Sequence, residues 1–201
     1  MHQRRVYMMR HAACKGNLEG RYVGRTDEAA LPQHLSALEK RKKIEGRVYT
    51  SPMLRCVQTA QAVCVSTDYT RIQEWCERDF GEYEYKNYQE LSDKPAYQEW
   101  IDSGGTLPFP AGETEEDFYT RCIKGLKKML EREEQIEKGC EEALICMLHG
   151  GVMMALLSLY GPPDKGFYDY QCKNGEAYLT RWEWESGGSP QISLLGKIES
   201  I

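Results

Sequence analysis

Short apolar runs alternate with amphipathic segments along much of the chain. Three runs, Arg5–Met9, Arg47–Thr50 and Ala143–Leu148, have the length and composition of strands, and the last is apolar throughout, as in a central strand of a parallel sheet. Between these runs, apolar side chains recur among charged ones at helical spacing, as in Pro32–Ile44. The repeated order of strand and helix predicts an α/β fold, with a mostly parallel central sheet flanked by helices on both faces.

Residues that cap helices mark several of the expected boundaries. Ser51 is predicted as the N-cap and Pro52 as the first residue of a helix that runs to Val65, because the first turn leaves unpaired the N–H group that proline lacks. Thr114 is predicted to cap a helix over Glu115–Lys138. The remaining expected elements are an extended stretch over Asp68–Trp75, helices over Tyr88–Ile101 and Val152–Tyr160, and strands over Ala177–Trp184 and Ile192–Ile198.

The stretch from about residue 77 to residue 113 has a different character from the rest of the chain. Glu77–Tyr88 is dense in aromatic residues, glutamate and glycine, and Gly104–Gly112 is rich in glycine and proline, which is typical of a loop. We expect this stretch to form a small cap of helices and loops. The cap is expected as an insertion in a single domain that comprises residues 1–201.

Composition narrows the class of protein. The chain carries 26 Lys and Arg against 31 Asp and Glu, a net charge of −5, which argues against nucleic acid as a partner. No apolar run approaches the ~20 residues of a membrane span. The apolar stretch Val6–Met9 is shorter than the roughly 7–15 residues of a secretory signal, so a cytoplasmic location is expected. The eight cysteines are spread singly from Cys14 to Cys172, which favours reduced thiols.

Candidate chemistry concentrates directly after the three central strand candidates. Arg10 and His11 follow the first, Arg55 lies one helical turn after the second, and His149-Gly150-Gly151 follows the third. Ligands of such sheets bind at the carboxyl ends of the strands. Arginine offers a fork of donors that fits phosphate oxygens, and a helix that starts after the glycines points free N–H groups at the same place. If the three strands are neighbours, these residues form a phosphate pocket; otherwise each is a surface or capping residue.

No metal site is expected. The four histidines form no H-x-x-H or H-x-x-x-H pair, and we find no zinc or haem spacing. We therefore expect neither a metal nor another cofactor.

The residues at the strand ends belong to ordered sequence blocks. The blocks are Arg10-His11 with Asn17, Arg21, Gly24 and Asp27; Ser51–Ala60 around Arg55; Glu77–Glu84; Pro110–Thr114; and His149–Gly151. Between Val6 and Tyr160 this pattern resembles the histidine phosphatase superfamily, also called phosphoglycerate-mutase-like. The resemblance implies that family's fold and a phosphoryl-transfer activity.

The resemblance also implies a role for each residue. His11 is implied to attack phosphorus and to carry the phosphoryl group as phosphohistidine. Glu77 is implied to protonate the leaving oxygen and to activate water, with Glu82 as the alternative acid. Glu113 is left open between placing the substrate and capping the next helix. The residues implied to hold phosphate are Arg10, Arg55 and His149, with Asn17, Cys14 and Gly150 as further contacts.

Three positions depart from the family pattern. Ala12 replaces a glycine after the nucleophile, which is harmless if its φ is negative and costly if it is positive. Cys14 replaces a threonine and supplies a weaker donor. Tyr85 replaces a glycine and is expected to narrow or line the mouth of the site. Because the main site residues are intact, we still predict a working enzyme of the histidine acid phosphatase type.

The predicted activity is hydrolysis of a small phosphorylated metabolite. A chain of 201 residues resembles the compact phosphatases more than the longer cofactor-dependent mutases. The span Phe80–Gly112 resembles α-ribazole-5′-phosphate phosphatases of cobalamin nucleotide-loop assembly, which implies α-ribazole 5′-phosphate as substrate. The alternatives are a phosphoglycerate-type mutase and a weakly active module that binds phosphorylated ligands. The expected partner is a small phosphate ester, not nucleic acid or membrane, and the expected assembly is a monomer or a homodimer.

Overall fold

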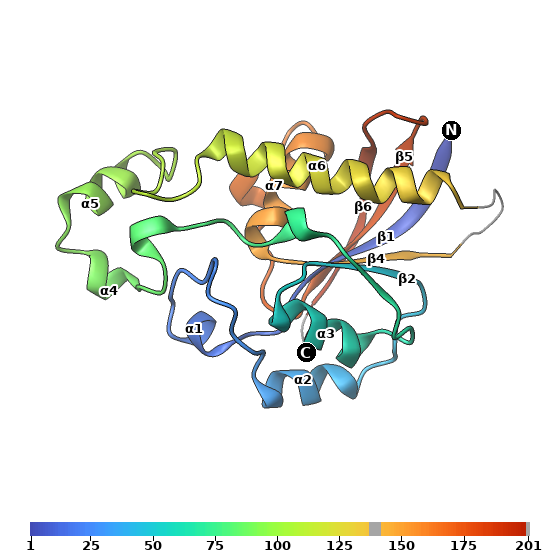
Figure 1. Cartoon of the computed structure of the whole chain (residues 1–201), viewed down its shortest axis with the longest axis horizontal. Helices are drawn as coiled ribbons and strands as arrows, with labels where there is room; N and C mark the ends of the chain where they lie inside the picture. Colours follow the sequence, from blue (N-terminus) through green and yellow to red (C-terminus); the bar gives the residue numbers. More distant parts are fainter. Residues whose placement is uncertain (137–141, 200–201) are drawn as a thin grey trace.

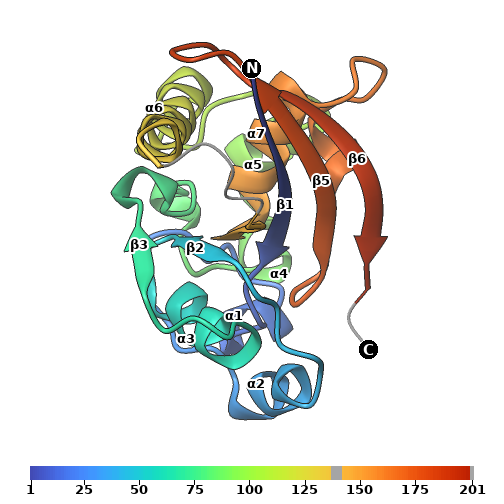
Figure 2. The same ribbon diagram turned by 90° about the vertical axis from the view of Figure 1, so that its right-hand side faces the viewer.

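A six-stranded sheet forms the centre of the computed structural model, which describes residues 1–136 and 142–199. The strand order is β3-β2-β4-β1-β5-β6. Figure 2 shows β3 and β2 on one side of β1, and β5 and β6 on the other. β1 and β2 flank β4 in parallel, β3 pairs in parallel with β2, and β5 and β6 continue the sheet in antiparallel pairs beside β1. The predicted α/β fold with a mostly parallel sheet is therefore confirmed. The strands are β1 (His2–Arg10), β2 (Arg47–Thr50), β3 (Tyr69–Arg71), β4 (Leu144–Leu148), β5 (Ala177–Trp184) and β6 (Gln191–Ile198).

Helices cover both faces of the sheet, as predicted (Figures 1 and 2). Successive side chains of a strand point to opposite faces, and each face has its own apolar core. Met8 of β1 and Cys146 of β4 pack with residues of α6 and α7, whereas Met9 and Met147 pack with residues of α2 and α3. The covering helices are α2 (Pro32–Glu39), α3 (Leu54–Val63), α6 (Glu115–Glu134) and α7 (Gly150–Tyr160).

A third apolar cluster lies at one end of the molecule, around α4 (Tyr88–Leu91) and α5 (Pro95–Asp102) (Figure 1). Its aromatic rings pack largely edge to face, for example Tyr83 against Tyr97 with ring centroids 5.2 Å apart. The aromatic residues that the sequence concentrates between 77 and 113 thus pack against one another. The cluster contains Tyr83, Leu91, Tyr97 and Phe109, with Tyr22, Phe80 and Trp100 packed against it.

The two helices on one face of the sheet are shorter than predicted. α2 ends at Glu39 because Ile44 leaves the helix and forms a parallel bridge with Cys64. The same bridge ends α3 at Val63 instead of Val65. The prediction of Ser51 as N-cap and Pro52 as first helical residue is wrong: Met53 is the N-cap, and the Ser51 hydroxyl bonds to His149.

Three other boundaries differ from the pattern. The helix predicted over Tyr88–Ile101 is two helices, because Pro95 begins α5 and holds the preceding Lys94 in an extended conformation at φ −92° and ψ 120°. The predicted extended stretch Asp68–Trp75 contains only β3 and then a 3₁₀ turn, Gln73–Trp75. Thr114 caps α6 as predicted, accepting from the Asp117 N–H, but the helix ends at Glu134. Its predicted end at Lys138 lies outside the described residues.

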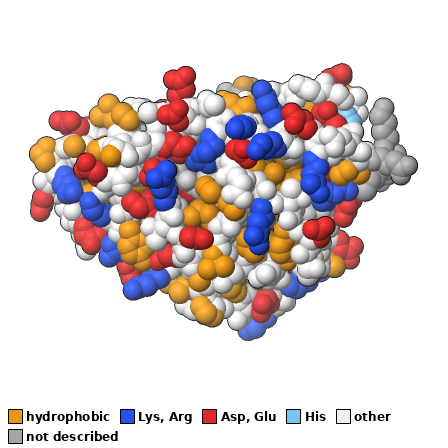
Figure 3. Space-filling model, in the orientation of Figure 1, with side chains coloured by type: hydrophobic (Ala, Val, Ile, Leu, Met, Phe, Trp, Pro, Cys, Tyr) orange, Lys and Arg blue, Asp and Glu red, His pale blue; other side chains and the backbone are white. Residues whose placement is uncertain are grey.

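Charged side chains of both signs are interspersed on the face of the molecule shown in Figure 3. Among the described residues, no helix has both the length and the apolar character needed to cross a membrane. The seven cysteines that the structure describes are all free thiols.

Candidate active site

The three strand ends that carry the candidate residues meet at one edge of the sheet. β4 lies between β1 and β2, so Arg10 stands beside Leu148 and Thr50 beside Met147. Backbone hydrogen bonds continue past the strands, from the His11 N–H to the Leu148 carbonyl at 3.0 Å. The condition on which the predicted phosphate pocket depended is met, because β1, β2 and β4 are neighbours.

His11 is buried in its neutral form with one defined tautomer. Its Nδ1 lies 2.7 Å from the carbonyl oxygen of Ala12, which can only accept, so Nδ1 carries the hydrogen. Nε2 accepts a hydrogen bond from Arg55 Nε at 3.3 Å. Burial, and then the charges of Arg55 and Arg10, hold the His11 pKa well below its usual value. A neutral His11 keeps a lone pair on Nε2, which accepts from Arg55 in this structure and can act as a nucleophile once the guanidinium donates to another acceptor.

Arg55 brings a positive charge into the interior without a carboxylate partner. Its side chain is fully buried, and in the described part of the chain it forms no ion pair. Besides His11, it donates to the carbonyls of Thr26 at 2.8 Å, Gly24 at 3.1 Å and Val23 at 3.3 Å. These carbonyls fix the guanidinium beside the nucleophile, and its uncompensated charge favours an anion at the site.

His149 stands next to His11 at the start of α7. The centroids of the two imidazole rings are 5.1 Å apart, and the rings meet edge to face. His149 Nε2 lies 2.7 Å from the Ser51 hydroxyl, and burial and the Arg55 charge lower the His149 pKa well below its usual value. The Arg10 guanidinium packs on Gly150, where an added Cβ would lie 3.3 Å from Arg10 Cζ. The N-terminus of α7 thus lies at the same site as Arg10.

Glu77 reaches the same helix from the segment that follows the 3₁₀ turn Gln73–Trp75. Its Oε2 accepts the Gly151 N–H at 3.1 Å, and its Oε1 accepts the Arg78 N–H at 2.9 Å. This approach requires a glycine, because a Cβ at position 151 would lie 2.4 Å from Glu77 Oε1. The structure therefore brings the carboxylate to the helix end that His149 begins.

A cavity of about 560 Å³ opens beside these groups. Arg10, Glu77 and Gly150 form part of its wall, whereas His11, Arg55 and His149 are buried and are not part of it. The wall includes cations that sequence reasoning missed: Arg78, Lys173 and Lys197. The only sign in the sequence that Arg78 belongs to the site is its place directly after Glu77. Lys173 lies in the loop before β5 and Lys197 lies in β6, far in sequence from the other site residues. The aromatic residues in the wall are Tyr22, Phe80, Trp100, Phe109, Phe118, Phe167 and Tyr168.

Two of the predicted phosphate contacts bond to each other instead of lining this cavity. Asn17 Oδ1 accepts from the Cys14 N–H at 3.2 Å, the Cys14 thiol at 3.1 Å and Asn174 Nδ2 at 3.2 Å. Burial is the main cause that raises the pKa of Cys14 to about 11, so its thiol stays protonated. Asn174 also donates to the His11 carbonyl at 3.1 Å, so this group braces the loop after the nucleophile.

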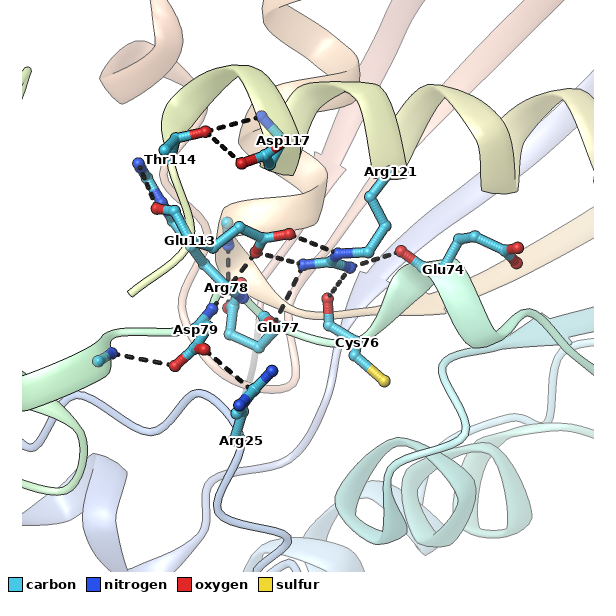
Figure 4. A network of polar contacts seen from close by, with 12 residues as sticks. Arg25, Glu74, Cys76, Glu77, Arg78, Asp79, Glu113, Thr114, Asp117 and Arg121 are labelled. Carbon is cyan, nitrogen blue, oxygen red and sulfur yellow. Dashed lines mark hydrogen bonds and ion pairs between the residues drawn. The ribbon is translucent and has the colours of Figure 1, made fainter. Parts of the chain in front are cut away.

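The structure separates the two candidate acids. Glu82 is exposed on the cap and does not line the cavity, whereas Glu77 does. Glu113 neither caps α6 nor lines the cavity: it forms an ion pair with Arg121 at 2.7 Å, and Thr114 caps the helix. Figure 4 shows this arrangement beside Glu77.

The replaced glycines have different consequences. Among the described non-glycine residues, only Tyr85 and Ala111 have positive φ, so Ala12 carries no backbone strain. Tyr85, at φ +59°, occupies a conformation that favours glycine. Its hydroxyl bonds to Glu28, and the Arg21 guanidinium lies 5.1 Å from its ring. Tyr85 therefore bonds to Glu28 and Arg21 and is not part of the wall of the cavity.

Known proteins resemble this chain in sequence and in fold. A protein from Hydrogenobacter thermophilus, provisionally named phosphoserine phosphatase 2, is 27% identical over 165 residues, which are 78% of each chain. The 6-phosphofructo-2-kinase/fructose-2,6-bisphosphatase 4 of Rattus norvegicus is 29% identical over 72% of this chain and 32% of its own. The α-ribazole phosphatase from Shigella flexneri has the same fold, with a TM-score of 0.76, 18% identity, and coverage of 98% of this chain and 96% of its own.

The family model of the histidine phosphatase superfamily (branch 1) matches residues 6–196. The match runs from within β1 to within β6, and it includes Arg10, His11, Arg55, Glu77 and His149. The chain belongs to the histidine phosphatase superfamily, branch 1.

Proposed function

We propose that this protein is a phosphomonoester hydrolase that acts through a phosphohistidine on His11. The observation that carries the proposal is the buried, neutral His11 with its Nε2 lone pair 3.3 Å from the Arg55 guanidinium. A nucleophile and a cation so close together suit attack on a phosphate ester. The family membership of the chain supports the same chemistry.

In the first step, the Nε2 lone pair forms a bond to phosphorus and the bond from phosphorus to the ester oxygen breaks. The electron pair of that bond stays on the leaving oxygen, and Glu77 in its carboxylic acid form donates a proton to it. In the second step, Glu77 as carboxylate removes a proton from water while the water oxygen attacks phosphorus. The N–P bond then breaks, its electron pair returns to Nε2, and inorganic phosphate leaves.

The phosphate is proposed to lie between the strand ends and the start of α7. Arg10, Arg55 and His149 offer donors there, and Gly150, the first residue of α7, packs against Arg10. Such fixed donors stabilise the charge on the equatorial oxygens as the transition state forms. Asn17 and Cys14 serve by bracing the loop after His11, as their mutual hydrogen bonds indicate.

The proposed substrate is a small phosphate ester whose leaving group contains a planar ring. Aromatic residues of the cap, including Trp100 and Phe109, line the cavity next to the cations Arg78 and Lys173. Rings stack on such walls, and hydroxyl groups can accept from the cations. α-Ribazole 5′-phosphate, from cobalamin nucleotide-loop assembly, combines a ring, hydroxyls and a phosphate, and an α-ribazole phosphatase shares the fold.

The test is a panel of phosphate esters with detection of phosphohistidine. The purified protein is expected to release phosphate from α-ribazole 5′-phosphate faster than from phosphoserine or fructose 2,6-bisphosphate. Acid-quenched enzyme should carry a phosphoryl group, and His11→Ala should remove both turnover and label. If the protein binds these esters but releases no phosphate, it is a module that binds phosphorylated ligands and not a hydrolase. Conversion of 3-phosphoglycerate into its isomer would instead establish a mutase.

A further inference from the structure

The guanidinium of Arg121 uses all five of its N–H groups on a single stretch of chain and on Glu113. Nε donates to Glu113 Oε1 at 2.8 Å, and Nη2 donates to Glu113 Oε2 at 2.7 Å. Nη1 donates to the carbonyls of Glu74 at 2.6 Å and Cys76 at 2.8 Å, and Nη2 also donates to the Glu77 carbonyl at 3.4 Å. Such a set is the complete donor capacity of an arginine, and no other side chain could supply it.

Two of the three carbonyls, those of Cys76 and Glu77, belong to a segment that has no regular structure of its own. Residues 76–80 lie between the 3₁₀ turn that ends at Trp75 and the next one, Gly81–Tyr83, so no helix or strand fixes their carbonyls. Figure 4 shows the Arg121 side chain extending from α6 to this segment. The charge-assisted hydrogen bonds from Arg121 take the place of the backbone hydrogen bonds that a helix or strand would supply.

Glu113 binds the same segment from the other side. Its Oε2 accepts the Asp79 N–H at 3.4 Å, and its own N–H donates to the Asp79 carbonyl at 3.0 Å. The Glu113 carbonyl accepts from Arg78 Nη2 at 3.4 Å. The two partners of the ion pair therefore fix the backbone on both sides of Glu77, while Gly151 holds its carboxylate.

We propose that Arg121, paired with Glu113, is a positioning residue that sets the location of the Glu77 carboxylate for proton transfer to the leaving oxygen. The inference rests on the proposed function, in which Glu77 is the acid. Arg121 does not line the cavity beside Arg10, and its bonds to residues 74–77 go to backbone carbonyls, so it acts through the backbone and does not touch substrate.

The experiment compares two esters that differ in their need for an acid. p-Nitrophenyl phosphate has a leaving group stable as an anion, whereas propyl phosphate requires protonation of its leaving oxygen. The value of kcat/KM reports steps up to release of this group. We expect Arg121→Ala to lose about tenfold to a hundredfold in kcat/KM on propyl phosphate, as a displacement near 1 Å does, and less than about threefold on p-nitrophenyl phosphate. Arg121→Lys should lie in between, because one ammonium cannot replace five donors.

A chemical rescue separates positioning from general loosening of the fold. Arg121 borders a cavity of about 480 Å³, so methylguanidinium at millimolar concentration can enter where the side chain of Arg121→Ala is missing. It should restore activity of that variant on propyl phosphate. Lys124→Ala is the matched control, because Lys124 also lies on α6 and approaches Glu74 at 3.9 Å, but through the carboxylate. It should retain wild-type rates on both esters.

Two results would overturn the proposal. One is an equal loss on both esters in Arg121→Ala, or in Glu113→Gln if the first variant fails to fold. The other is an absence of rescue in a folded Arg121→Ala variant. Failure of the proposed function is visible separately, because wild-type protein would then form no phosphohistidine from either ester.

Discussion

His11 and His149 share an environment that keeps both imidazoles neutral. Each pKa is lowered first by burial and then by Arg55, the fully buried cation beside both rings. A neutral His11 can attack phosphorus, whereas a protonated one cannot. The cost of this arrangement is an arginine without a carboxylate partner, which carbonyl oxygens of the loop at residues 23–26 solvate instead.

The lowered pKa values make stability depend on pH. The folded protein keeps both histidines neutral, while the unfolded chain binds protons below the ordinary value of 6.5. Their contribution is therefore complete above this pH and is lost as the pH falls below it. In urea unfolding between about pH 5 and pH 8, His149→Gln should reduce the acid-side slope by up to about 1.4 kcal/mol per pH unit. Parallel curves for variant and wild type would contradict the assignment.

The choice between the two candidate acids is also a question about single residues. Glu77 bonds to Gly151 beside the cavity, whereas Glu82 is exposed on the cap. Glu77→Gln is expected to lower kcat/KM on propyl phosphate by about 10²–10⁴-fold, since it removes the proton donor. Glu82→Gln, with the same change in charge, should stay within about twofold. The reverse ranking would make Glu82 the acid.

At the scale of elements, the sequence pattern predicts best what depends on local chemistry. β4 is apolar throughout because it is central and buried on both faces, and Thr114 caps α6 through its own side chain. The predicted start of α3 is wrong. Serine is a common N-cap, but the Ser51 hydroxyl bonds to His149 in the folded protein, and Met53 is the N-cap. The sequence pattern predicts strands at the positions of β5 and β6. Their antiparallel pairing, of β5 with β1 and of β6 with β5, depends on contacts between distant residues, which a local pattern does not contain.

The same distinction applies to the site. Arg10, His11, Arg55 and His149 follow strands, so the topology of a parallel sheet brings them together. Lys173 and Lys197 could not be predicted, because their place in the cavity wall depends on how the loop before β5 folds and on the pairing of β6 with β5 at the edge of the sheet.

The contact between the start of α7 and Glu77 can be tested by a substitution at Gly151. Gly151→Ala would place a Cβ 2.4 Å from Glu77 Oε1 and 3.3 Å from Phe118 Cζ. Alanine favours a helix, so the thermal midpoint should change little while the displaced carboxylate lowers kcat on propyl phosphate by about tenfold or more. Gly196→Ala in β6, where no atom lies within 4 Å of the added Cβ, is the control and should retain activity. Full activity in Gly151→Ala would show that the Gly151–Glu77 contact is dispensable.

At the scale of the whole molecule, the cavity lies where the cap meets the carboxyl edge of the sheet. Arg10 and Gly150 contribute from the sheet side, and Phe80, Trp100 and Phe109 from the cap cluster. In the proposed function, the sheet side carries out the chemistry of the phosphate, which is the same for every ester. Selection among leaving groups therefore falls to the cap, whose aromatic cluster is separate from the two cores of the sheet.

One pair of cap variants can test whether the aromatic residues of the cap select the leaving group. Trp100→Ala removes a ring from the cavity wall, and the loss of stacking, about 1–3 kcal/mol per ring, should raise KM for α-ribazole 5′-phosphate by about tenfold. Propyl phosphate has no ring, so its kcat/KM should stay within about threefold. Tyr88→Ala is the matched control, because Tyr88 lies on the cap and packs against Tyr97 but does not line the cavity. Equal losses on both esters in Trp100→Ala would mean that the ring supports the fold of the cap, and that selection of the leaving group lies elsewhere in the cavity wall.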